Sequence, residues 1–133
     1  MKRIFDFTCS FVGLFFLSPL ILLLSTILIK STSKGPVFFI QERVGKDGKI
    51  FKMIKFRTMF VAQESSSTIS IKGDIRVTKI GVFLRRYKLD ELPELINVLL
   101  GHMSLVGPRP DVPGYSDKLV GEDRNILKLR PGI

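Results

Sequence analysis

An uncharged, apolar run near the N-terminus is the strongest constraint on the fold of this chain. From Phe7 to Ile29 there are 23 consecutive positions without a charged side chain. A helix of that length extends about 34 Å, which is comparable with the roughly 30 Å hydrocarbon core of a bilayer. The sequence therefore predicts a membrane-attachment segment within residues 1–34 and a small separate domain at residues 35–133.

Several structures compete for this run. A signal peptide is disfavoured because Asp6 interrupts the basic start and no small-residue cleavage site follows. A buried core helix is disfavoured because a run with no polar face needs a much larger protein around it. A spanning helix remains, but Ser18-Pro19 lies at the midpoint, where proline removes a backbone hydrogen bond and bends the helix.

Basic residues flank both ends of the run: Lys2 and Arg3 before it, Lys30 and Lys34 after it. Positive charge on both sides gives no strong bias between inside and outside. A helix that enters the membrane, bends at Ser18-Pro19 and returns would place both ends on the cytoplasmic face. These physical arguments support the re-entrant helix and the kinked span equally.

The charge of the chain points to an anionic partner. The net charge is +9, and Lys2, Arg3 and Asp6 supply only +1 of it, so residues 30–133 carry +8. Beside a membrane segment, such an excess favours lipid head groups or phosphorylated substrates. We expect no nucleic-acid partner, because Trp is absent and no RNA-binding or zinc-finger pattern appears.

Metal-binding residues are few. The chain has one cysteine, Cys9, and one histidine, His102, which excludes disulfide frameworks, cysteine zinc sites and multi-histidine sites. Any metal is therefore expected to be a hard cation held by carboxylates and substrate oxygens.

The domain after the apolar run is predicted to be α+β. Two strands, Val37–Val44 and Ile50–Met59, flank the turn sequence Gly45-Lys46-Asp47-Gly48, and an Asp-Gly pair between apolar runs is a hairpin signal. Residues 63–74 read as a Ser-rich loop, and a short helix is predicted near Glu122–Leu127.

Two further helices are predicted. Thr78–Tyr87 forms the first, with Arg85 and Arg86 outward and Ile80, Phe83 and Leu84 inward. The second begins at Asp90 as its N-cap and ends at Gly101. Its inward residues recur at helical spacing: Leu92, Leu95, Ile96 and Leu99.

Two features could carry chemistry. Asp90 and Glu91 are adjacent carboxylates at a helix start, where an ionised group can attack phosphorus or bind Mg²⁺; the competing interpretation is ordinary helix capping. Arg109 lies between two prolines in a rigid Gly107–Pro110 turn. Fixed in this way, its guanidinium suits bidentate phosphate binding, although a surface arginine has the same pattern.

Four stretches of the chain resemble the bacterial sugar transferases, the monotopic phosphoglycosyl transferases that start glycan assembly on polyprenyl phosphate. They are the apolar segment with Ser18-Pro19, GPVFFIQERVGKDGKIFKMIKFRTM, DIRVTKIGVFLRRYKLDELPELINVLLGHMSLVGPRP and LKLRPGI. The resemblance covers almost the whole chain, and its LDELPEL to GPRP stretch is very specific.

The resemblance implies an enzyme that moves a sugar 1-phosphate from a UDP-sugar to undecaprenyl phosphate and releases UMP. Such reactions initiate capsule, O-antigen or exopolysaccharide assembly. Asp90 would be the nucleophile, with Glu91 assisting as base or in the metal site. The family uses Mg²⁺, which would be held by Asp90, Glu91 and Glu122. Phosphate-binding cations would be Arg109, Lys55, Arg57, Arg76 and Arg85.

The resemblance also implies a location. The family's apolar helix is re-entrant and broken at the Ser-Pro pair, here Ser18 and Pro19. The protein would lie in the bacterial inner (cytoplasmic) membrane, in the inner leaflet, with the catalytic domain facing the cytoplasm.

Two departures from the family pattern matter. His102 stands where such sequences often have an acidic residue. The chain also stops at Ile133, whereas family members usually continue for several dozen residues past LKLRPGI. The alternative hypothesis is therefore a truncated, catalytically silent, membrane-anchored fragment.

Overall fold

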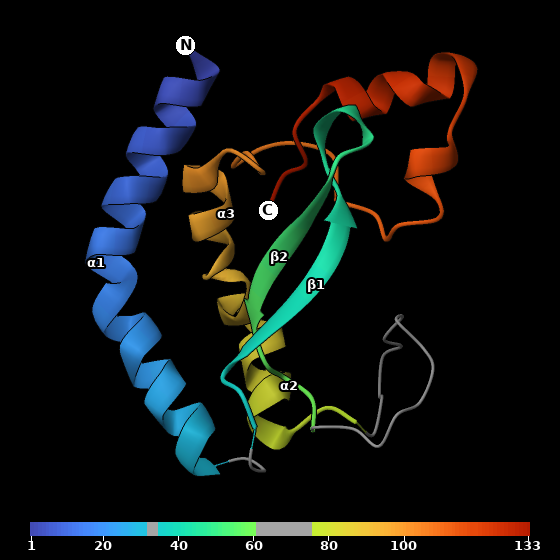
Figure 1. The fold of residues 1–133 in the computed structure, drawn as a ribbon. Coiled ribbons are helices and arrows are strands. Elements are labelled where there is room, and N and C mark those ends of the chain that lie inside the picture. Colours follow the sequence, from blue (N-terminus) through green and yellow to red (C-terminus); the bar gives the residue numbers. More distant parts are fainter. Residues whose placement is uncertain (32–34, 61–75) are drawn as a thin grey trace.

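The computed structural model describes residues 1–31, 35–60 and 76–133 (Figure 1). The predicted Ser-rich loop at 63–74 lies outside the described residues. The helices are α1 (Lys2–Ser31), α2 (Lys79–Arg86) and α3 (Glu94–Leu100), and the strands are β1 (Phe38–Val44) and β2 (Ile50–Phe56). Four short 3₁₀ turns join them in the described part: η1 (Lys46–Gly48), η2 (Leu89–Glu91), η3 (Ser116–Lys118) and η4 (Gly121–Lys128).

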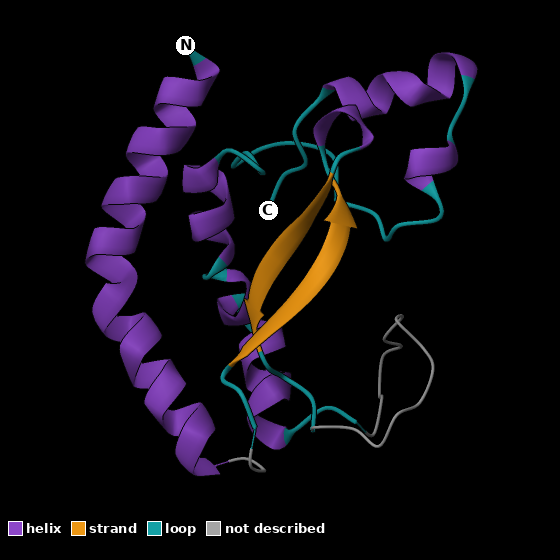
Figure 2. Ribbon diagram, viewed as in Figure 1, coloured by secondary structure: helices purple, strands orange, loops and turns teal. Residues whose placement is uncertain are grey.

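These elements pack in layers. Figure 1 shows α1 along one side of the domain, α3 next to it, and the hairpin on the far side of α3. The two strands form one antiparallel sheet (Figure 2), in which Phe38 pairs with Phe56 and Val44 pairs with Ile50. The prediction of an α+β fold with a long apolar N-terminal helix and a hairpin is confirmed.

Helix α1 is continuous, and the predicted break at Ser18-Pro19 is not present. Pro19 lies inside the helix and has no N–H to donate to the carbonyl of Phe15, four residues earlier. The Ser18 hydroxyl donates to that same carbonyl at 2.9 Å. Because this bond gives the Phe15 carbonyl a donor, the helix is not interrupted at Pro19. It is curved along its length (Figure 1).

One stripe of α1 faces the domain and the rest is exposed. Buried residues recur along the helix at three- to four-residue spacing: Asp6, Ser10, Leu24 and Leu28, with half-buried Gly13 and Leu17 between them. On the other side, Phe15 and Phe16 are 71% and 73% exposed. Within the span Lys2–Leu28, an 18-residue window has a mean hydropathy of 2.4, so this helix is long and apolar enough to cross a membrane.

Two apolar clusters hold the described part of the domain together. Leu24 and Leu28 of α1 pack with Phe56 and Leu84. Phe51 and Met53 of β2 pack with Val98 of α3 and with Met103. The first cluster therefore joins the C-terminal half of α1 to α2 and the hairpin, and the second joins the hairpin to α3.

Strand β2 ends at Phe56, three residues earlier than predicted. The chain there leaves the hairpin, since the Thr58 carbonyl accepts from the Thr78 backbone N–H at 2.9 Å. Met59 then pairs with Val77 as an isolated antiparallel bridge. This pairing brings Arg57 and Thr58 to the start of α2.

Helix α2 occupies the predicted range, but two of its side chains point the other way. Phe83 was expected inward and is 50% exposed, with its ring 4.9 Å from that of Tyr87. Arg85 was expected outward and is half-buried, donating from Nε to the Thr58 hydroxyl at 2.9 Å. The Thr58–Thr78 pairing places a hydrogen-bond acceptor on the inner side of α2, and this acceptor draws Arg85 inward.

Asp90 is not the N-cap of a helix. It lies inside the 3₁₀ turn η2, and α3 begins only after Pro93, because proline lacks the N–H of a helix interior and suits the first turn. The C-terminal prediction is confirmed: Gly101 adopts φ +87° and caps α3. A short helix near Glu122–Leu127 is also confirmed, as η4.

Candidate active site

Asp90 is a buried carboxylate with an unpaired oxygen. Its side chain belongs to η2 and the residue is 8% exposed. Its Oδ1 atom is buried and has no hydrogen-bond partner in the described part of the chain. A desolvated carboxylate oxygen without a donor costs free energy in the folded state, and such groups are candidates for a functional role.

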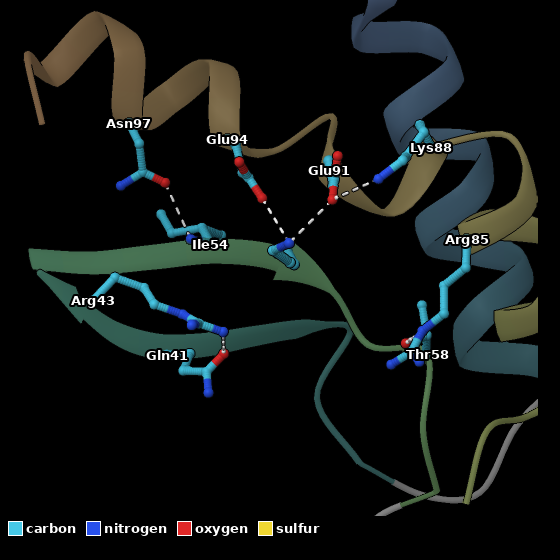
Figure 3. Close-up of polar contacts among 10 residues, drawn as sticks. Gln41, Arg43, Ile54, Thr58, Arg85, Lys88, Glu91, Glu94 and Asn97 are labelled. Carbon is cyan, nitrogen blue, oxygen red and sulfur yellow. Dashed lines mark hydrogen bonds and ion pairs between the residues drawn. The ribbon is translucent and has the colours of Figure 1, made fainter. Parts of the chain in front are cut away.

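Lys55 lies between two neighbouring carboxylates, those of Glu91 and Glu94, and Figure 3 shows these two acids side by side above the hairpin. Its ammonium group is 3.3 Å from Glu91 Oε1 and 3.0 Å from Glu94 Oε1. Lys88 approaches Glu91 Oε1 at 3.4 Å from the exposed side. Since the Glu94 side chain is 3% exposed and that of Lys55 is 20% exposed, this ion pair is shielded from solvent far more than a surface pair.

Alternation along β2 explains why Lys55 faces this cluster. Phe51, Met53 and Lys55 point to one face of the hairpin, because successive strand residues alternate. Phe51 and Met53 are buried in the cluster with Val98 of α3. The lysine at the end of this apolar row therefore lies under η2 and the start of α3.

Asn97 fixes α3 against β2. Its side-chain oxygen accepts from the Ile54 N–H at 3.1 Å, and its side-chain nitrogen donates to the Lys52 carbonyl at 2.7 Å. The amide thus pairs with backbone groups on the edge of β2 that β1 does not reach, and Figure 3 shows the contact to Ile54. This contact holds Glu94, one helical turn earlier, beside Lys55.

The adjacent carboxylates Asp90 and Glu91 have opposite pKa shifts. Burial, and then the charge of Glu91, raises the pKa of Asp90, although Lys55 opposes this. Burial also acts to raise the pKa of Glu91, but Lys55 and Lys88 outweigh it and hold that pKa below its ordinary value. Burial raises the pKa of Glu94 against the effect of Lys55. Carboxyl groups whose pKa values are shifted apart within one site can take different chemical roles.

The predicted phosphate-binding cations occupy different places. Lys55 lies between Glu91 and Glu94, and the charge of Arg85 acts on Asp90 from α2. Arg57 is buried directly after β2, and Arg76 is half-buried where its carbonyl accepts from the Phe60 N–H at 2.9 Å.

Arg109 lies at the other end of the hairpin. It lines a small cavity with Val44 and Gly45, and the neighbouring Asp111 carbonyl accepts from the Val44 N–H at 2.9 Å. The strand from Lys55 back to Ile50, the partner of Val44, spans about 17 Å. The structure therefore brings Asp90, Glu91, Lys55 and Arg85 together but leaves Arg109 apart from them.

Glu122 is also distant from Asp90. It is exposed on η4, which packs against the hairpin turn η1, whereas η2 lies beside α2 at the opposite end (Figure 1). Within the described residues, no group of three His, Cys, Asp or Glu side chains could hold a metal ion.

Two residues that shape the site were not predicted from the sequence. Glu94 is a buried acid, and only its position one turn after the Asp90-Glu91 pair could have indicated it. Arg43 lies on the same hairpin face as Lys55, with its guanidinium 2.7 Å from Gln41 Oε1 and its Nε buried. Burial, and then the charge of Arg109, lowers the pKa of Arg43, while Glu94 opposes this. The charges of both Arg109 and Glu94 therefore act on Arg43.

Comparison with known proteins finds one family over the whole chain. The sequence profile described as "Bacterial sugar transferase" matches residues 1–133. A UDP-glucose:undecaprenyl-phosphate glucose-1-phosphate transferase of Klebsiella pneumoniae is 45% identical over 99% of this chain, which spans 29% of that protein. A Bacillus subtilis protein named as a putative undecaprenyl-phosphate N-acetylgalactosaminyl 1-phosphate transferase is 46% identical over 92% of the chain, with 68% of its own length covered.

A third relative has the same sugar in its name as the Bacillus subtilis protein. The UDP-N-acetylgalactosamine-undecaprenyl-phosphate N-acetylgalactosaminephosphotransferase of Aeromonas hydrophila is 40% identical over the full chain, which spans 32% of its length. The chain therefore spans about a third of two of these relatives and about two thirds of the other.

Proposed function

Because the chain belongs to the bacterial sugar transferase family, we propose that it transfers a sugar 1-phosphate from a UDP-sugar to undecaprenyl phosphate and releases UMP. The observation that carries this proposal is the unpaired, buried Oδ1 of Asp90 beside the Lys55 cluster. The product would initiate assembly of a cell-surface glycan.

The reaction would proceed in two displacements at one phosphorus. A carboxylate oxygen of Asp90 attacks the β-phosphorus of the UDP-sugar, and UMP leaves with the electron pair of the broken P–O bond. A phosphate oxygen of undecaprenyl phosphate then attacks the aspartyl-phosphosugar, and the Asp90 carboxylate is restored. The raised pKa of Asp90 makes its ionised form more basic, and therefore more nucleophilic, than that of a solvated aspartate.

The surrounding cations support both displacements. Lys55 and Arg85 favour the ionised form of Asp90, and both can stabilise negative charge that develops on the phosphoryl oxygens. Arg43, on whose charge Glu94 acts, would approach the second phosphate of the diphosphate. Arg109, farther along the hairpin, would contact the nucleoside end of an extended UDP-sugar.

Asp90 and Glu91 also fit a magnesium ion. Mg²⁺ is usually bound by one or two carboxylates together with substrate phosphates, and the unpaired Oδ1 of Asp90 offers one such oxygen. When bound, the ion would neutralise diphosphate charge. Glu122 does not join these residues in the structure, so we assign it no part in the ion's binding.

The arrangement of α1 supports a monotopic location. Lys2 and Asp6 at its start contact the domain through Val106 and Ser104, and Leu28 near its end packs in the cluster with Leu84. A 30-residue helix, about 45 Å long, with both ends against one basic domain cannot cross a bilayer without taking that domain into the membrane. Both ends would therefore lie on the cytoplasmic face of the inner membrane.

The deciding experiment measures UMP release and covalent labelling together. The membrane-reconstituted chain is incubated with Mg²⁺ and a panel of UDP-sugars carrying a labelled β-phosphate, with and without undecaprenyl phosphate. We expect UMP release, retention of label on the protein when the acceptor is omitted, and loss of both by about a thousandfold in Asp90→Asn. Asp123→Asn, an exposed acid on η4, is the matched control and should retain activity.

Two results would contradict parts of this proposal. Undiminished UMP release by Asp90→Asn would remove the assigned nucleophile. Release that strictly requires the acceptor, with no label retained, would replace the intermediate with direct transfer. The competing proposal of a catalytically silent fragment is consistent with the chain spanning 29% of the Klebsiella relative, and it predicts no UMP release from any UDP-sugar.

A further inference from the structure

A second cationic cavity lies where α1 begins, away from Asp90. It has a volume of about 170 Å³, which is room for roughly five water molecules at about 30 Å³ each. Its lining includes five basic residues and one acid: Lys2, Arg3, Lys46, Lys128, Arg130 and Asp6. The basic residues come from α1, the hairpin turn and the segment after η3, so folding alone assembles this concentration of positive charge.

The acid in this cavity offsets only one of the five positive charges. Both oxygens of the Asp6 carboxylate have other partners, since one accepts from the Ser104 hydroxyl at 2.8 Å and the other from the Leu105 N–H at 3.3 Å. The lining therefore keeps four positive charges in excess over its negative charge. This imbalance attracts an anion.

Three of the five cations are positioned by the protein itself. Lys2 donates to the Val106 carbonyl at 2.9 Å, Arg3 to the Leu99 carbonyl at 2.7 Å, and Arg130 to the Gly101 carbonyl at 3.0 Å. The side chains of Lys46 and Lys128 are exposed, and neither donates a side-chain hydrogen bond within the described residues. The cavity thus combines fixed charges with two adaptable donors.

The helix start reinforces this charge. The first turn of α1 has no acidic residue, so Lys2 and Arg3 sit at the positive end of the helix dipole, where cations are unfavourable. An anion in the cavity would relieve both the dipole and the cation repulsion. Phe5, three residues after Lys2 on the same helix, is 62% exposed, so the exposed apolar surface of α1 begins close to the cavity.

We infer that this cavity binds a phosphate group, and that the phosphate is that of an anionic phospholipid. Its position at the start of an apolar exposed helix places it at the depth of lipid head groups. It is separate from Asp90: the cavity adjoins the C-terminal end of α3, and eleven residues at helical rise separate Asp90 from Gly101, roughly 16 Å. The site would anchor and orient the domain on the membrane rather than take part in transfer.

The test is titration calorimetry of the full chain in a neutral detergent. The probes are dihexanoyl phosphatidylglycerol, dihexanoyl phosphatidylcholine and inorganic phosphate. We expect phosphatidylglycerol to bind, and Lys46→Ser/Lys128→Ser to weaken binding by about thirtyfold, since each lysine near an anionic lipid contributes roughly a factor of five. Lys49→Ser/Lys118→Ser removes the same charge from exposed sites outside the cavity and should change binding by less than about twofold.

Each other outcome is decisive. Equal weakening in the two double variants would replace the cavity with diffuse surface charge and overturn the inference, as would equal binding of phosphatidylcholine or no binding at all. If inorganic phosphate displaces phosphatidylglycerol at a comparable concentration, the cavity binds phosphate, and the inference that the phosphate belongs to a lipid is wrong. Asp90→Asn should bind phosphatidylglycerol normally, so failure of the transferase proposal and failure of this one are distinguishable.

Discussion

At the scale of single residues, Asp90 and Lys55 form the centre of the site. Asp90 is buried with one oxygen unpaired, and Lys55 is the strongest influence that opposes its raised pKa. The same lysine is the counter-ion of the buried Glu94. Removing it should therefore change both the pH dependence of the reaction and the stability of the fold.

The first prediction concerns pH. Asp90, the proposed nucleophile, must be ionised to attack, and burial raises its pKa above the ordinary 3.8. UMP release should therefore fall as the pH drops through that raised pKa. In Lys55→Met the pKa of Asp90 rises further, and the acid limb of kcat/KM should move to higher pH. Lys88→Met, whose charge acts on Glu91, should leave the limb in place; an unmoved limb in Lys55→Met would contradict this account.

The second prediction concerns stability. Lys55→Met leaves the Glu94 carboxylate buried without its counter-ion, which should lower the free energy of unfolding at pH 7 by about 2–4 kcal/mol. Because the pKa of Glu94 is raised, the cost is present where Glu94 is ionised and shrinks as the pH falls through that pKa. Denaturant unfolding of the detergent-solubilised chain at two pH values measures this.

The matched control lies on the same strand. Lys52 is exposed on the opposite face of β2, across from Glu42, so Lys52→Met should change stability by no more than about 0.5 kcal/mol. A similar loss in both variants would mean that the Glu94 pair contributes nothing specific.

At the scale of elements, short polar contacts determine how the segments around the site meet. Asn97 joins α3 to the edge of β2, and Thr58 joins the end of the hairpin to Thr78 and Arg85 of the next segment. The segment that presents Arg109 is held by residues near Ile133, since the Pro108 carbonyl accepts from the Gly132 N–H at 2.8 Å.

The third prediction tests this last contact. A Cβ on Gly107 would lie 2.3 Å from the Arg130 carbonyl oxygen and 2.8 Å from the Gly132 nitrogen, so Gly107→Ala must push the two backbones apart. We expect a loss of about 2–3 kcal/mol in the free energy of unfolding and a higher KM for the UDP-sugar, because the Arg109 turn shifts. Gly13→Ala, whose Cβ meets only Leu95 at an ordinary 3.6 Å, is the control, and equal stability of the two variants would contradict the prediction.

At the scale of the whole molecule, α1 is part of the domain's packing as well as the proposed membrane segment. The Arg3 guanidinium donates to the Val98 and Leu99 carbonyls at the end of α3, and Leu24 packs with Phe56. The other side, with Phe11 and Phe15, is exposed. The helix therefore has a protein-facing stripe and an exposed apolar side, and the monotopic proposal places the apolar side in lipid.

The fourth prediction follows from the contacts that both halves of α1 make with the domain. In a Cys9→Ala background, single cysteines at Lys2 and at Lys49 of the hairpin turn should react with a membrane-impermeant maleimide from the same side of the membrane. Inverted inner-membrane vesicles should label both, and intact cells neither. Labelling of the Lys2 cysteine from the opposite side would show a spanning helix and contradict the monotopic proposal.

The sequence by itself determined the elements of this protein. Local signals suffice for them: 23 uncharged positions make a membrane-length helix, Asp-Gly between apolar runs makes the hairpin, and Gly101 ends α3. The family motifs identified Asp90 and Glu91 as the residues to examine.

Only the tertiary structure decided how these residues are arranged. Sequence could not show that a Ser18 hydroxyl bond carries α1 through Pro19, that Arg85 turns inward to Thr58, or that Glu94 shares Lys55 with Glu91. It also could not show that Arg109 and Glu122 lie toward the hairpin turn, away from Asp90. The physical reason is that burial, and the pKa and pairing that follow from it, depends on which elements pack together, and chain-distant contacts leave no local pattern.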